Sequence, residues 1–274
     1  MKNFVSANNL LKSVILFLAF VFSFNTANAT IILEGSDALG FHSASNAGAA
    51  TYRDQVWSAI GGSDARTIAV IGNSLSGITT TTHAISKFGS LSAAGTLSNY
   101  VAVYFQAGGG CCAENDALIS SAADKAAVSS YLSSNGTIMI GDYTGGAAWD
   151  FAVGTTGGAA SHVQGFGGAA AGGTSCSDGE IVTAAGLANG FTQPPIIGCW
   201  THQAYDQAGY FAGLGFTQSF FNAGPDYNPG YSSLLSNGLT VTGVVTGAVP
   251  EPTSIALFGL GLLGFAASRR KSKK

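Results

Sequence analysis

The sequence YVAVYF at residues 100–105 is followed by a helical segment at residues 115–132 and by TIMIG at residues 137–141, and this order decides the fold. Both short stretches are continuous apolar runs, which is typical of strands buried on both faces of a sheet. The segment between them has apolar residues at helical spacing: Leu118, Ile119, Ala122, Ala126, Val128 and Leu132. This order predicts two parallel strands joined by a right-handed crossover.

The residues before this unit repeat the same alternation. An apolar run at residues 31–33 predicts a first strand, and a run at residues 67–71 predicts another. Between them, the apolar stripe of residues 52–60 predicts a helix that ends at Gly61 and Gly62. We therefore expect an α/β fold with a parallel sheet and helices on both faces, in which the strands at 67–71, 100–105 and 137–141 are parallel.

The residues after this unit are harder to assign. Residues 154–173 are mostly Gly, Ala, Ser and Thr, which predicts a long surface loop. Short apolar runs at 181–183, 196–200 and 239–245 are candidate strands. The segment 216–231 is rich in aromatic residues, which either pack in the core or stack on sugars.

The unit from residue 100 to 142, with its glycine-rich loop and the sequence SSNG before the second strand, resembles the class I glutamine amidotransferase-like domains. The resemblance implies a flavodoxin-like layout. Catalytic members of that family place a cysteine in a tight turn just after a strand. Here TIMIG is followed by DYTGG at residues 142–146, which has neither cysteine nor serine, so the family's chemistry is expected to be absent.

The chain begins with the marks of a secretory signal peptide. Lys2 and Lys12 precede or flank an apolar run at residues 14–24, and Ala27 and Ala29 form an A-x-A cleavage site. Cleavage after Ala29 would remove residues 1–29 and leave an exported α/β domain at residues 30–248. A permanent N-terminal anchor is the alternative.

The chain ends with a proline-flanked glutamate, an apolar run at residues 254–267 and a basic tail. Pro250 and Pro252 fix the backbone around Glu251 in an extended, accessible form. The apolar run is about 21 Å long as a helix, short of the roughly 30 Å hydrocarbon core. Arg269 and Arg270 begin a basic cluster that would hold the extreme C-terminus in the cytoplasm.

This order resembles the PEP-CTERM sorting signal of exported bacterial proteins. The resemblance implies that residues 249–274 form a sorting signal with a single apolar helix, which holds the protein transiently in the inner membrane. It also implies a partner, the exosortase, an inner-membrane protease that acts on the tail and releases the body to the cell surface or the extracellular space.

The charge distribution separates the body from these ends. The chain has 11 basic and 14 acidic residues, but residues 30–249 hold only four basic residues against 13 acidic ones, a net charge of −9. Such a body has no electrostatic footprint for nucleic acid. Its Gly-rich, weakly charged composition is common among extracellular proteins, and its length suits one core.

The four cysteines all lie in the exported body, and an oxidising compartment favours disulfides. We expect Cys176 to pair with Cys199, which leaves Cys111 and Cys112 to bond to each other or stay free. A reactive thiol at Cys111 or Cys112, with a histidine as base, is the alternative. Metal binding is disfavoured because the C-x₂-C spacing of zinc sites is missing.

No motif in the body assigns a reaction, a cofactor or a metal. The glycines at 108–110 lack a neighbouring Lys or Arg to complete a phosphate loop. The acids Asp37, Asp142, Asp150, Asp178 and Glu180 follow no calcium-loop pattern and are expected to be solvated. We expect a non-catalytic surface protein with a structural or adhesive role, for which extracellular polysaccharide is a candidate partner. One alternative is a carbohydrate-binding module that uses the C-terminal aromatics. The other is a hydrolase of amidotransferase-like fold.

Overall fold

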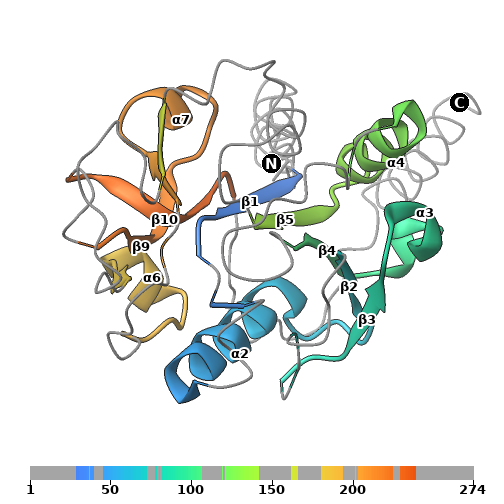
Figure 1. Cartoon of the computed structure of the whole chain (residues 1–274), viewed down its shortest axis with the longest axis horizontal. Coiled ribbons are helices and arrows are strands. Elements are labelled where there is room, and N and C mark those ends of the chain that lie inside the picture. Colours follow the sequence, from blue (N-terminus) through green and yellow to red (C-terminus); the bar gives the residue numbers. More distant parts are fainter. Residues whose placement is uncertain are drawn as a thin grey trace, which may run out of the picture.

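A computed structural model of the 274-residue chain describes residues 29–36, 38–39, 46–72, 78, 80, 82–106, 119, 121–141, 162–165, 180–193, 201, 203–224 and 229–238. These residues form one mixed sheet of ten strands with helices on both sides (Figure 1). The strand order is β3-β2-β4-β5-β1-β10-β8-β6, with β9 paired to β10 and β7 paired to β9.

The first half of the sheet is parallel. It contains β3 (Ile85–Phe88), β2 (Ile68–Ile71), β4 (Ala102–Phe105), β5 (Thr137–Gly141) and β1 (Thr30–Glu34), each parallel to its neighbour in this order. Every residue of β2 and β4 is buried, as their continuous apolar sequences IAVI and AVYF require. The predicted parallel arrangement of the strands near 67–71, 100–105 and 137–141 is confirmed.

The second half is antiparallel, which the sequence analysis did not predict. Its strands are β10 (Tyr231–Ser236), β8 (Gln203–Asp206), β6 (Val163–Gly165), β9 (Gln218–Asn222) and β7 (Ile181–Val182). β10 joins the halves by pairing antiparallel to β1, with Leu33 opposite Leu235. Strand β6 lies inside the stretch expected to be a long loop, so that prediction is wrong for residues 163–165.

The flavodoxin-like layout is not confirmed. In that layout a parallel sheet ends at its fifth strand. Here the first strand of the chain, β1, lies at the end of the parallel set, and the sheet continues through β10 into the antiparallel half. The coarser prediction, a mixed α/β domain with helices around a sheet, agrees with the structure.

Helix α2 (Ala47–Gly61) covers one face of the sheet (Figure 1). It begins where the Asn46 side chain accepts hydrogen bonds from the backbone N–H groups of Gly48 and Ala49. It ends before Gly62, whose φ of 54° suits glycine. The prediction of a helix that stops at this glycine pair is confirmed.

The opposite face carries α3 (Leu91–Ala94), η2 (Leu97–Asn99) and α4 (Ala122–Ser133). Helix α4 begins with a capping box, in which Ser121 and Asp124 bond each other's backbone N–H groups. The start predicted at residue 115 lies outside the described residues. Two short helices, α6 (Ala184–Ala188) and α7 (Tyr210–Gly213), accompany the antiparallel strands.

Two apolar clusters hold these layers together, one on each face of the sheet. Under α2, the ring of Trp57 packs edge-on against Tyr104 of β4, with centroids 5.5 Å apart. Under α4, Val128 and Tyr131 pack with Val103, Phe105 and their neighbours. Burying one such side chain contributes about 2 kcal/mol, so both faces stabilise the sheet.

The aromatic residues near the C-terminus belong to this core. Phe216, Phe220 and Phe221 are at most 1% exposed. The ring of Phe221 packs edge-on against Tyr52 of α2 at 5.4 Å. These three rings are therefore core residues, which confirms the core-packing interpretation for them, and the alternative that they stack on a sugar is wrong.

Candidate functional site

The most unusual chemistry in the described residues is a buried acid at the end of strand β1. Glu34 is the last residue of β1 and is fully buried. It lies between Gly141 of β5 and Leu234 of β10, at the junction of the parallel and antiparallel halves. The carboxyl ends of parallel strands are where open α/β sheets usually bind ligands.

The surroundings of Glu34 favour its neutral form. Tyr52 of α2 and Ser36 both donate hydrogen bonds of 3.2 Å to its Oε1 atom. Burial raises the pKa of Glu34 well above its usual value, and the charge of Glu180 raises it further. Hydrogen bonds from Tyr104, Ser36 and Tyr52 lower the pKa but do not offset the burial.

Burial also raises the pKa of the Tyr52 phenol, and the charges of Glu180 and Glu34 add to this rise. Glu180 is itself fully buried and immediately precedes β7. The expectation that Glu180 is a solvated loop acid is therefore wrong. Its backbone is held by Gln193, whose amide donates to the Glu180 carbonyl at 2.7 Å.

Sequence reasoning missed this cluster because its members are far apart in the chain and meet only in the fold. The one available signal was an acidic residue at the end of an apolar strand, since such strands are buried on both sides. Within the described residues the cluster does not reach solvent: Glu34, Glu180, Tyr52, Ser36 and Tyr104 are each at most 1% exposed. Its chemistry there is that of a neutral, hydrogen-bonded acid that joins β1 to α2.

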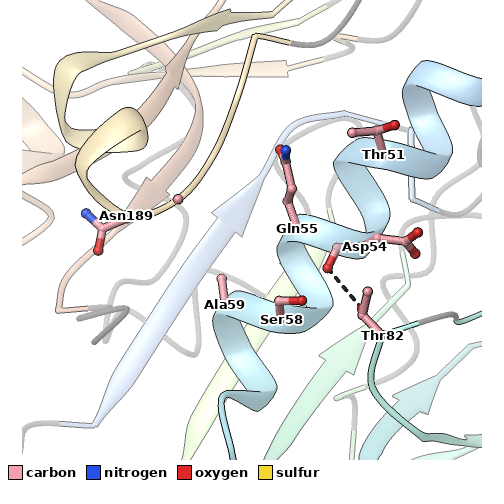
Figure 2. A pocket seen from close by; sticks show the side chains of 8 residues that line it. Thr51, Asp54, Gln55, Ser58, Ala59, Thr82 and Asn189 are labelled. Carbon is pink, nitrogen blue, oxygen red and sulfur yellow. Dashed lines mark hydrogen bonds between the residues drawn. The ribbon is translucent and has the colours of Figure 1, made fainter. Parts of the chain in front are cut away.

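A second feature is a solvent-open groove of about 360 Å³ over the outer side of α2 (Figure 2). Its lining consists of side chains from α2, the loop before β3 and the turn after α6: Thr51, Asp54, Gln55, Ser58, Ala59, Thr82, Asn189 and Gly190. The Gln55 amide group donates to Thr192 at 2.6 Å and accepts from the Thr192 backbone N–H at 3.2 Å. These bonds tie α2 to the turn after α6.

The groove contains one ionisable side chain, Asp54, and its orientation is fixed. Arg53 is 5% exposed, and its Nε atom donates to Asp54 Oδ1 at 2.8 Å. A second guanidinium nitrogen lies 2.7 Å from the same oxygen. The loop before β3 also contacts this residue, because the Thr82 hydroxyl donates to the Asp54 backbone carbonyl at 3.0 Å (Figure 2).

Of the four histidines that could serve as a base, the structure describes His83 and His162. His162 stacks on Tyr210 with ring centroids 4.2 Å apart, and its Nδ1 atom lies 3.9 Å from Asp206 Oδ2. His83 Nε2 lies 2.8 Å from the Arg66 carbonyl oxygen. His42 and His202, and all four cysteines, lie outside the described residues.

Most of the other residues singled out from the sequence also lie outside the described residues. Of the signal-peptide cleavage pair, Ala29 lies directly before β1, whereas Ala27 lies outside the described residues. Also outside them are the candidate disulfide residues Cys111, Cys112, Cys176 and Cys199 and the sorting residues Pro250, Glu251, Pro252, Arg269 and Arg270. The candidate strands at 196–200 and 239–245 and the C-terminal apolar helix fall there too. Among the described helices, none has the length and apolarity that a membrane crossing requires.

Comparison with known proteins identifies the tail. Residues 248–271 match the PEP-CTERM protein-sorting motif, as the resemblance of the tail had indicated. No curated protein and no solved structure matches the chain. The motif supports an exported protein that is processed by an exosortase, a membrane enzyme, and is placed at the surface or outside the cell.

Proposed function

We propose that the body of this exported protein has a non-catalytic, structural or adhesive role at the cell surface or in the extracellular matrix. The observation that carries the proposal is the sorting motif at residues 248–271, which supports delivery to that place. The body then acts where it is displayed, after the tail has been processed.

The chemistry of the described body supports a role without catalysis. Glu34, whose pKa is raised by burial, is enclosed and bonded to Tyr52 and Ser36, so it lies within the junction of the two half-sheets instead of facing a substrate. The aromatic side chains Phe216, Phe220 and Phe221 are used in the core. The groove over α2 is one described surface that offers hydroxyl and amide groups to a partner.

A body-swap experiment tests this proposal. The native chain is compared with a chimera in which residues 1–29 and 249–274 flank an unrelated secreted domain. Both are expressed in a gene-deletion strain of an exosortase-bearing host, and cell-to-cell aggregation and retention in the matrix are measured. We expect both proteins to leave the inner membrane, but only the native body to restore aggregation or matrix retention.

Two outcomes would contradict the proposal. Equal restoration by the chimera would show that the body has no adhesive role of its own. Covalent labelling of Cys111 or Cys112 by a mild electrophile, with loss of a measured hydrolase activity, would favour the hydrolase hypothesis instead. The same strains without exosortase provide the control for routing.

A further inference from the structure

The groove over α2 has a composition that restricts what it can bind. Its lining side chains carry three hydroxyls, two amides and one carboxylate, from Thr51, Ser58, Thr82, Gln55, Asn189 and Asp54. Among the described residues that line the groove, Ala59 supplies the only apolar side chain, and none is Lys or Arg. Among these described residues, an anionic ligand would meet only a negative charge.

The walls of the groove are fixed before any ligand arrives. The reciprocal bonds between Gln55 and Thr192 hold the turn after α6 against α2. The Thr82 hydroxyl bonds to the Asp54 carbonyl and holds the loop before β3 against the same helix. Because these contacts are already made, binding would cost little ordering of side chains and loops.

The polar groups in this frame also have set directions. Arg53 orients the Asp54 carboxylate through Oδ1, and a carboxylate accepts strong hydrogen bonds from ligand hydroxyls. The Thr51 hydroxyl donates to the Ala47 carbonyl at 3.0 Å, so it presents its oxygen as an acceptor. Ser58 lies one helical turn further along α2 from Asp54 and adds a hydroxyl that both donates and accepts (Figure 2).

We propose that this groove binds a neutral carbohydrate. A sugar offers several adjacent hydroxyls, each a donor and an acceptor, which complement the Ser58 hydroxyl and the acceptor oxygens of Thr51 and Asp54. The negative charge of the body disfavours acidic sugars. The inference rests on the proposed surface role, for which it names a partner chemistry and a site. None of the described residues that line the groove is aromatic, so binding to one sugar unit is weak and gains strength from repeated units.

Ligand-observed saturation-transfer NMR suits such weak binding. The full chain is produced in an exosortase-bearing host, and the form found outside the cells is purified. Glucose, galactose and mannose are the neutral probes, and glucuronate is the acidic probe. We expect saturation transfer to at least one neutral sugar and at least a five-fold smaller effect on glucuronate.

Two matched substitutions place the binding in the groove. Ser58 and Ser129 are both exposed serines on α-helices, but only Ser58 lines the groove. Ser58→Tyr should fill the groove and reduce the transfer at least five-fold, whereas Ser129→Tyr on α4 should leave it unchanged. Asn189→Ala, from the other wall, is a second variant for the case in which Ser58→Tyr lowers the melting temperature.

The outcomes separate this inference from the proposed function. A protein that leaves the membrane and restores aggregation but shows no transfer to any neutral probe overturns the sugar site alone. Equal transfer with Ser58→Tyr and Asn189→Ala, both folded, also overturns it, as does equal transfer to glucuronate. Loss of aggregation by the native body with sugar binding intact would instead overturn the adhesive role.

Discussion

At the scale of single residues, Glu34 couples the fold to pH. Its pKa in the folded protein is raised well above 4.5, its ordinary value, chiefly by burial. At pH values between the ordinary pKa, which applies to the unfolded chain, and the raised pKa of the folded protein, the Glu34 carboxyl loses its proton only in the unfolded chain. The free energy of unfolding therefore falls as the pH rises through this interval, by about 1.4 kcal/mol for each unit of pKa difference.

Glu34→Gln should remove this loss because glutamine stays neutral. Relative to the native protein, we expect the variant to have a higher free energy of unfolding at pH 8 than at pH 4. Urea denaturation at both pH values measures the difference. A variant whose relative stability is the same at both pH values would contradict the inferred pKa.

Asp64→Asn is a control of opposite sign. Hydrogen bonding to Arg66 lowers the pKa of Asp64, so its ion pair stabilises the fold above the unfolded pKa and is lost as the pH falls through the folded pKa. The variant should thus have a lower free energy of unfolding than the native protein at neutral pH, and the same free energy of unfolding in acid. The effect is small because both side chains are at least one-third exposed.

Gly35 permits the close approach of two strands directly after Glu34. A Cβ atom at Gly35 would lie 1.9 Å from the backbone oxygen of Gln203 in β8. Gly35→Ala should therefore lower the free energy of unfolding by at least about 2 kcal/mol. Gly89→Ala is the matched control, since a Cβ there meets no atom within 4 Å; equal effects of the two changes in urea denaturation would refute the steric explanation.

At the scale of helices and strands, the sequence predicted the strands β1, β2, β4 and β5 and the helices α2 and α4, but it missed β3, α3 and η2. The runs IAVI, AVYF and TIMIG are apolar throughout because both of their faces are buried. The central strand of the other half, β10, has the sequence YSSLLS, whose three serines are buried. Polar residues in a buried strand carry no apolar signal, and the three-residue β6 is too short to show a period.

Helix α4 offers a test of local signals. Ser121 Oγ accepts from the Asp124 backbone N–H at 3.0 Å, and Asp124 Oδ2 accepts from the Ser121 backbone N–H at 3.3 Å. Ser121→Ala removes the first bond and should cost about 1 kcal/mol of stability. Ser129→Ala, in the exposed middle of α4, should cost nothing because alanine favours helix; thermal denaturation that ranks the two variants the other way would disprove the capping role.

At the scale of the whole molecule, the sites depend on contacts that no local pattern announces. Gln55 and Thr192, which fix the walls of the groove, are 137 positions apart. Glu34 and Tyr52 come from a strand and a helix, and Glu180 joins them from the antiparallel half. The sorting tail is different, because its three parts are consecutive and each has its own physical signature. For that reason the sequence predicted the route of the protein but neither of its two polar clusters.

The tail also gives the test that concerns the entire chain. We infer that Pro250 and Pro252 favour an extended segment that a protease can bind, and that Arg269 and Arg270 would set the position of the apolar run at the membrane. We expect the double change Pro250→Ala and Pro252→Ala, or removal of both arginines, to leave most of the protein unprocessed in the inner membrane. Val249→Ala, within the matched stretch but outside the Pro-Glu-Pro tripeptide, should be processed normally. Mass spectrometry of the native extracellular form should find no residues beyond about Pro252, whereas an intact C-terminus ending in Lys274 would show that the tail is not removed.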